Sequence, residues 1–405
     1  MHTPDRRRRN DRRRLLSALF WLAAASLSRP VWALEYQMHG FLSQGFILSE
    51  GNDFYGDSTA GSFEYYEAGL NGRLKLWSDL SVSAQVLLRD AGPTDDGGPR
   101  LDFAFADYRL LTGESGELGL RAGRVKNAYG LFNDTRDVVF ARPGILLPLS
   151  VYFESQGART LLFSSDGVQA YGGLNMGGHY LSLVTTYAPD HDLGRSEEER
   201  LAGSLADQGK VSMREFRSVR LQDDWGNGRW TAALSYIHGR LDFRPDPGAP
   251  TDFDFDFDLY MLSGRYNGER YSLTAEYGLT AFAGSLQTFG FPTHLDFLSD
   301  GYYLQGDYFL NPRWTLSARY DAGTLDRNDR DGSDCATSTG QPQDKHACYA
   351  HDLSMGINWR PDEHWGFWAE YHWIDGTYSV SQQDNANKPL DPHWSMLLLM
   401  GSYRF

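Results

Sequence analysis

Acidic side chains alternate with apolar ones in one stretch, TDFDFDFDLY, Thr251 to Tyr260. Successive side chains of a β-strand point to opposite faces, so a strand here would gather the aspartates on one face. Neighbouring carboxylates on that face would lie about 7 Å apart, and their repulsion would cost roughly 0.6 kcal/mol per pair in water. Such a row is tolerable where it is wet, and it would attract cations. Its members are Asp252, Asp254, Asp256 and Asp258, opposite Phe253, Phe255, Phe257 and Leu259.

A second set of ionisable residues lies in the segment from Lys126 to Ser165, which mixes both signs of charge with apolar residues. Cations that converge in space would favour phosphate-like solutes, and the candidates are Lys126, Arg136 and Arg142, with Arg121 just before them. An apolar segment left in water is unfavourable, so we expect this one to pack against a wall.

Nucleophilic chemistry has weaker support. Histidines are available for a Ser-His or Asp-His arrangement, but no local motif ties any of them to a nucleophile: His39, His191, His351, His372 and His393. No nucleotide, haem or flavin fingerprint is present, so we expect no cofactor and no metal. Cys335 and Cys348 lie close together in a polar segment, where an oxidising compartment favours a disulfide; two free thiols are the alternative.

The elements that must position these residues are sixteen segments of alternating character that follow Leu34. In the clearest pair, Leu70 to Lys75 and Leu80 to Arg89 each have one apolar face, and Ser78-Asp79 connects them as a hairpin. The connections alternate between short turns and long polar loops, and one of these loops is expected at Ala281 to Ser299. This asymmetry is typical of a transmembrane β-barrel.

Aromatic residues and the C-terminus agree with a barrel. Aromatics flank the short turns, where a membrane interface would hold them: Trp77, Trp225, Trp230, Tyr266, Tyr271, Trp314, Trp359 and Trp365. The chain ends in WSMLLLMGSYRF, with Leu397, Leu399, Gly401, Tyr403 and Phe405 on one face. This end resembles the C-terminal signal of bacterial outer-membrane barrels, which implies that Tyr403 and Phe405 engage the barrel-assembly machinery.

The N-terminus predicts export. Seven arginines precede the apolar run from Leu15 to Leu27, and small residues stand at Val31 and Ala33, which is typical of a leader cleaved after Ala33. A disordered basic tail or a short membrane anchor is the alternative. Loss of 1–33 removes eight of the 38 basic and two of the 53 acidic residues, which leaves a net charge of −21 and argues against nucleic acid as a partner.

We therefore predict an all-β, transmembrane antiparallel barrel of about 16 strands over 34–405, in the outer membrane of a Gram-negative bacterium and in contact with its lipid. Sixteen strands leave an aqueous lumen. The run LRAGRVKNAYGLFNDTRD, Leu120 to Asp137, resembles the strand-to-loop junction of porins and of phosphate-selective porin-like proteins. That resemblance implies a passive, trimeric pore for small hydrophilic solutes, narrowed by a third external loop, 126–165, that folds inward.

Strand parity predicts which charges face the lumen. One side would be basic, with Arg73, Lys75, Arg89 and Arg121, and the other mainly acidic, with Asp254, Asp256, Asp258, Glu276, Asp307 and Glu370 and with Arg319 among them. The aspartate face would line a wet outer vestibule; a metal site or a strand that continues beyond the membrane are the other interpretations. A plugged barrel that acts as a scaffold or adhesin, and an outer-membrane hydrolase, remain the rival functions.

Overall fold

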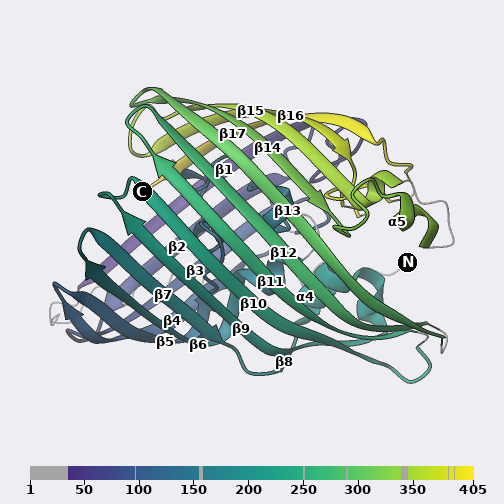
Figure 1. Cartoon of the computed structure of the whole chain (residues 1–405), viewed down its shortest axis with the longest axis horizontal. Coiled ribbons are helices and arrows are strands. Elements are labelled where there is room, and N and C mark those ends of the chain that lie inside the picture. Colours follow the sequence, from purple (N-terminus) through teal and green to yellow (C-terminus); the bar gives the residue numbers. More distant parts are fainter. Residues whose placement is uncertain are drawn as a thin grey trace, which may run out of the picture.

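The chain forms one antiparallel sheet that closes on itself as a barrel, described here from a computed structural model (Figure 1). The structure describes residues 35–405 except 96, 155–157, 250, 289–290, 339–344, 382 and 387. The predicted leader, 1–33, lies outside the described residues. The first strand pairs with both the second and the last, so every strand of the barrel has two neighbours. Closure satisfies the backbone donors and acceptors that a sheet edge would expose.

Sixteen strands make the barrel wall, and a two-residue strand, β8, pairs only with β9. This confirms the predicted fold class and strand number. The wall strands are β1 (Tyr36–Glu50), β2 (Tyr65–Lys75), β3 (Leu80–Ala91), β4 (Arg100–Gly113), β5 (Gly116–Lys126), β6 (Ser164–Met176), β7 (His179–Tyr187), β9 (Gly209–Trp225), β10 (Trp230–Pro245), β11 (Thr251–Asn267), β12 (Tyr271–Thr288), β13 (Phe291–Asn311), β14 (Trp314–Thr324), β15 (Tyr349–Trp359), β16 (Trp365–Gly376) and β17 (His393–Arg404).

Short helices lie in the connections. They are η2 (Asn133–Thr135), η3 (Val139–Ala141), α2 (Leu149–Tyr152) and α3 (Ala158–Phe163) after β5; α4 (Arg195–Ala202) and η4 (Gly203–Asp207) after β8 (His191–Asp192); and α5 (Ser333–Ser338) and η5 (Lys345–Cys348) before β15. Among the described residues, every helix is too short or too polar to cross a membrane. In Figure 1 the long connection that carries α5 lies at the opposite end of the strands from the C-terminus.

One predicted connection is wrong. Residues 281–288 and 291–299, expected to belong to a long loop, instead extend β12 and β13, which pair from Tyr271↔Tyr308 to Thr288↔Phe291. A membrane-spanning strand needs only about 9–11 residues, whereas β12 has 18 and β13 has 21. These strands therefore continue well beyond the membrane. The loop prediction failed because their alternating pattern continues into residues that are also polar enough to suggest a loop.

Aromatic side chains form a belt on the outer wall at the short-turn end, at the positions the sequence predicts. Trp225 stacks on Trp230, whose ring lies 4.5 Å from that of Tyr266. On the other side of the barrel Trp314 stacks on Trp359, and Trp365 lies 4.9 Å from Tyr403. Amphipathic rings prefer a membrane interface, so this belt marks one boundary of the membrane-spanning part.

Candidate functional site

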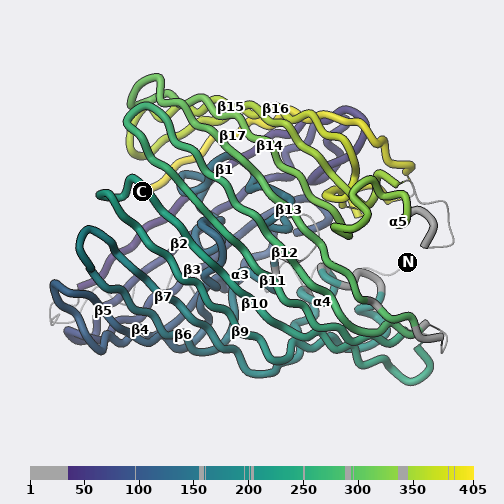
Figure 2. The backbone as a smooth tube through the Cα atoms, in the orientation of Figure 1, coloured from purple at the N-terminus to yellow at the C-terminus, as the bar shows by residue number. Residues whose placement is uncertain are grey.

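The connection after β5, residues 127–163, lies against the inner face of the wall rather than outside the barrel. In the view of Figure 2, α3 overlaps the wall strands, and contacts with inward carboxylates place the loop inside the barrel. Three wall carboxylates accept hydrogen bonds from loop backbone N–H groups: Glu276 from Leu131 (2.9 Å), Glu370 from Ile145 (2.7 Å) and Asp321 from Leu149 (2.7 Å). The loop thus contacts β12, β14 and β16. Because hydrogen bonds to a carboxylate are stronger than neutral ones, these contacts hold the loop firmly.

Buried ion pairs hold the other side of the loop. The Glu154 carboxylate lies among three guanidiniums: Arg136 at 2.6 Å, Arg159 at 2.8 Å and Arg89 of β3 at 3.2 Å. Although burial raises the pKa of Glu154, these guanidiniums lower it well below its ordinary value. Arg142 pairs with Glu67 of β2 at 2.6 Å. The loop is therefore fixed to β2 and β3 as well as to the opposite wall.

The predicted constriction cations are accordingly compensated. Arg89, Arg136 and Arg142 are each at most 6 % exposed and pair with buried carboxylates. Lys126 pairs with Asp137 (2.6 Å) and Asp102 (3.1 Å). Sequence reasoning identified these residues as lumen charges but missed their partners. Arg142 and Glu67 lie 75 residues apart, and the loop must fold before Arg136 meets Glu154 or Lys126 meets Asp137.

Two apolar clusters also pack between loop and wall. In one, Tyr152 and Val151 of α2 lie with Ile237, Leu259 and other inward residues of β9–β13. In the other, Phe140 and Ile145 lie with Trp368 and with Met396, Leu398 and Met400 of β17. The inward face of β17 is thus apolar. The sequence did not predict this, because a strand that is apolar on both faces lacks the alternation of polar and apolar residues from which the inward face is inferred.

The aspartate face of β11 points the other way from the prediction. Leu259 and Met261 are at most 1 % exposed and belong to the inner cluster, whereas Tyr260 and Leu262 are 46 % and 61 % exposed on the outer wall. Asp254, Asp256 and Asp258 share the parity of Tyr260, so they lie on the outside of the barrel, and Phe253, Phe255 and Phe257 face inward. The prediction that these aspartates line the lumen was wrong.

The physical reason is the length of β11. It has 17 residues, more than a membrane requires. The aspartates precede Tyr260 in the chain and lie nearer the loop end, where β11 begins. Outside the hydrocarbon the outer face is free to carry charge, and the inner face packs against the loop. There Asp258 contacts Tyr236 and His238, and Asp254 pairs with Arg240. No group of three or more metal-ligating side chains stands together in the described residues.

Other predicted residues lie on the inner wall as expected from parity. Glu276 and Glu370 are buried beneath the loop, as described above. Arg121 pairs with Asp107 at 3.2 Å and donates to Gln169, and Arg73 donates to Ser81. At the short-turn end Lys75 pairs with Glu35 at 2.8 Å.

The remaining two predicted residues, Asp307 and Arg319, are on β13 and β14. Asp307 accepts hydrogen bonds from Gln305 and Ser272, and Arg319 donates to the Leu146 carbonyl at 3.0 Å. The acidic side predicted for the lumen is therefore reduced to Asp307, because the other carboxylates lie outside the barrel or are occupied by the loop.

Three arginines that sequence reasoning did not select also face the loop. Arg220 of β9 pairs with Asp134 at 3.2 Å, Arg265 of β11 lies 4.7 Å from the Phe132 ring, and Arg360 lies 5.6 Å from the Phe140 ring. A cavity of about 690 Å³ opens beside Arg360, between loop residues 142–143 and the turns after β11, β13 and β15. Leu262 and Tyr266 face outward on β11, so the alternation of side chains along this strand would have placed Arg265 on the inner face.

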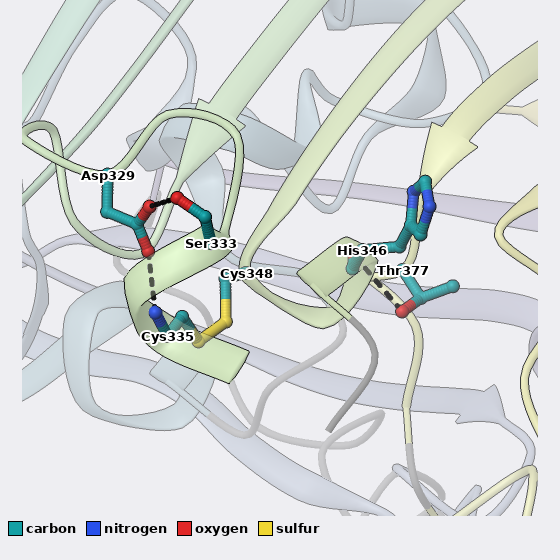
Figure 3. Close-up of a disulfide and its surroundings, with 6 residues drawn as sticks. All are labelled: Asp329, Ser333, Cys335, His346, Cys348 and Thr377. Carbon is teal, nitrogen blue, oxygen red and sulfur yellow. Dashed lines mark hydrogen bonds between the residues drawn. A yellow bond between two sulfur atoms is a disulfide. The ribbon is translucent and has the colours of Figure 1, made fainter. Parts of the chain in front are cut away.

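A disulfide joins Cys335 and Cys348 in the connection between β14 and β15, with their Cα atoms 6.5 Å apart (Figure 3). The Asp329 carboxylate accepts the Cys335 backbone N–H at 2.7 Å, and the His346 carbonyl accepts the Thr377 hydroxyl. The disulfide thus closes a loop that contacts the connection after β16, at the long-loop end of the barrel.

Comparisons with known proteins agree with this geometry. No family model and no curated protein matches the chain. Solved structures do match over most of both chains: the outer membrane channel DcaP of Acinetobacter baumannii at 12 % identity (93 % of this chain, 99 % of that one, TM-score 0.56) and an anion-selective porin of Comamonas acidovorans at 14 % (92 % and 100 %, TM-score 0.56). The trimer form of OmpT of Vibrio cholerae matches at 13 % (92 % and 100 %, TM-score 0.52). At these identities the likeness concerns the fold, and on that ground this chain has the sixteen-stranded barrel fold of the outer-membrane porins.

Proposed function

We propose that this protein is a passive outer-membrane pore for small hydrophilic solutes. The observation that carries the proposal is the barrel wall itself: sixteen strands, with polar side chains on the inner face between the loop and the short turns, such as Arg121, Gln305 and Asp307. A wall of this size encloses a lumen wider than side chains alone fill. The inward-facing connection after β5 is then the element that narrows the path.

The proposal includes several features of the whole protein. The leader 1–33 would direct export in a Gram-negative bacterium, and the C-terminal strand would engage the barrel-assembly machinery. A homotrimer is supported by the apolar outer wall, on which large side chains such as Leu70, Val86 and Leu120 are 44–51 % exposed, and by the trimeric form of one structural neighbour. The protein would be a channel and not an enzyme.

A plugged barrel is the second candidate, and one observation favours it. The connection after β5 contacts β2, β3, β12, β14 and β16, and two apolar clusters fill the space between it and the wall. A loop held on so many sides would block diffusion if it left no gap.

Conductance in a planar bilayer distinguishes the two. The purified protein is first shown to be folded, by its resistance to unfolding in detergent below its melting temperature. It should then give stable steps of increased conductance in KCl. Liposome swelling with neutral sugars would then give the size limit. Folded protein that produces neither steps nor swelling would contradict the pore and support the plugged barrel.

A further inference from the structure

Two tyrosines lie over glycines of the wall near the short turns. Tyr171 of β6 pairs with Gly119 of β5, and a Cβ atom added at Gly119 would come within 2.4 Å of the Tyr171 ring. Tyr180 of β7 lies in the same way over Gly173, where a Cβ atom would come within 2.5 Å of its ring. Glycine thus leaves room for each ring to rest against the backbone. We call Tyr171 and Tyr180 the tyrosine pair.

Alternation along β5 shows that the tyrosine pair faces inward. Leu118 and Leu120 are 40 % and 47 % exposed on the outer wall, so Glu117 and Gly119 point to the lumen. The first ring of the pair lies over Gly119, and the hydroxyl of the second donates to Glu117 at 3.0 Å. Because these two wall positions are one strand repeat apart, about 7 Å, the rings occupy neighbouring places on the wall. Both tyrosines are half-buried, so part of each ring is open to the lumen.

Polar groups surround the tyrosine pair. Its two hydroxyls donate to Asp107 at 2.7 Å and to Glu117 at 3.0 Å. The Arg121 guanidinium lies 4.4 Å from the Tyr171 ring, and its Nε and Nη1 atoms donate to Asp107 and Gln169. Among the residues that the structure describes, its Nη2 atom meets no acceptor, and the side chain is 32 % exposed. Within the same residues the second Glu117 oxygen accepts no bond, so one donor and one acceptor remain for a molecule in the lumen.

The charges of this group do not favour an ion as the ligand. Asp107 and Glu117 stand against Arg121, so the local balance is one negative charge, which disfavours a small anion. A cation would in turn meet the exposed Arg121 guanidinium, which is always charged. A neutral molecule avoids both costs. It must offer an apolar face to the rings and hydroxyls to the remaining donor and acceptor.

Pyranose sugars have this combination. Their ring C–H bonds form an apolar face that packs on an aromatic ring, and the hydroxyls at the rim both donate and accept. Resting on the proposed pore function, we infer that the tyrosine pair, with Arg121 and Glu117, is a binding site for neutral pyranose sugars at the short-turn end of the lumen. The site makes the pore favour a sugar ring over an acyclic polyol, which carries similar hydroxyls but no rigid apolar face.

Equilibrium binding tests the site without requiring conduction. Saturation-transfer NMR of the folded protein, in a detergent without a sugar headgroup, should show binding of methyl α-glucopyranoside and none of sorbitol. Tyr180→Leu should weaken the binding roughly fivefold, the order of one aromatic contact, and Arg121→Gln should weaken it by a similar factor through loss of the Nη2 donor. Tyr180→Phe, which keeps the ring, should keep most of the binding. In a planar bilayer the glucoside should also lower the KCl conductance in a saturable way.

A matched control and a second variant keep the outcomes separate. Tyr108→Leu removes a tyrosine of β4 that is 49 % exposed on the outer wall, and it should leave binding unchanged. Arg121→Gln serves if Tyr180→Leu does not assemble. A conducting wild type that treats the glucoside and sorbitol alike, or variants of the site that bind as the wild type does, would overturn the inference while the pore stands. Folded wild type that binds the glucoside without conductance would overturn the pore and leave the site in place. Folded wild type that neither binds nor conducts would overturn both.

Discussion

Glu154 is the residue on which loop docking depends most directly. Its carboxylate is the shared partner of Arg89, Arg136 and Arg159, all buried. Removing one member of a buried ion pair leaves the other charge uncompensated, which typically costs about 3–5 kcal/mol. We therefore expect Glu154→Gln to lower the free energy of unfolding by that order, measured by denaturant titration in detergent micelles. Glu114→Gln, in the exposed turn between β4 and β5, is the control; equal stability of the two variants would contradict the role of Glu154.

Asp384 makes the stability of the loops at the long-loop end depend on pH. It accepts the backbone N–H of Gly56 at 3.0 Å and so connects the loop after β16 to the loop after β1. Burial raises the pKa of Asp384 to about 6, against the hydrogen bonds from Gly56 and Tyr55. Between its unfolded value near 3.9 and pH 6 the folded state binds more protons than the unfolded state, so stability rises as pH falls through this window and is level above it.

Native-state hydrogen exchange, corrected for intrinsic rates, checks this dependence. The opening free energy of residues 52–58 should be larger at pH 4.5 than at pH 7, and Asp384→Asn should remove the difference. Asp53 is the control. Although burial raises its pKa, Lys388 and Thr59 hold it below its ordinary value, so it titrates below this window and Asp53→Asn should leave the slope in place. A slope that survives Asp384→Asn would assign it to another group.

At the scale of elements, the orientation of β11 is the most direct test of the wall. Phe257 is 5 % exposed and packs inside the barrel, whereas Asp256 lies on the outer face. Because Cys335 and Cys348 are joined in a disulfide, a new cysteine would be the free thiol. We expect a membrane-impermeant maleimide to label Asp256→Cys and not Phe257→Cys in intact cells. The reverse pattern would restore the parity expected from the sequence.

The elements also show what sequence reasoning can and cannot reach. The strand count, the turn positions and the outward face of β17 follow from alternation, because one face meets lipid and the other does not. Alternation is ambiguous where a strand leaves the membrane, and β11 was misassigned for that reason. The pairs Arg142–Glu67 and Arg220–Asp134 were out of reach, since they depend on which wall positions the loop meets, and that is set by its three-dimensional path rather than by any spacing in the chain.

At the scale of the whole molecule, the last residue takes part in closure of the barrel. Phe405 exchanges two backbone hydrogen bonds with Gly40, of 3.1 and 3.0 Å, and so extends the β1–β17 pairing by one step. Deleting Phe405 removes both bonds and the terminal aromatic ring. We expect the variant to yield less folded, heat-modifiable barrel in the outer-membrane fraction, whereas Phe405→Trp, which keeps an aromatic end, should assemble normally. Deletion without loss of folded barrel would show that closure does not need this residue.

A second variant separates closure of the seam from recognition of the terminus. A Cβ atom at Gly40 would come within 2.5 Å of the Phe405 ring, so Gly40→Val should displace the ring from the seam and leave the terminal sequence intact. If docking of the ring closes the barrel, Gly40→Val should lower the yield of folded barrel as the deletion does. If the assembly machinery reads the terminal aromatic alone, Gly40→Val should assemble and only the deletion should fail. We expect both variants to lower the yield, because each weakens the end of the β1–β17 pairing next to Phe41↔Arg404, and backbone groups left unpaired in lipid are costly.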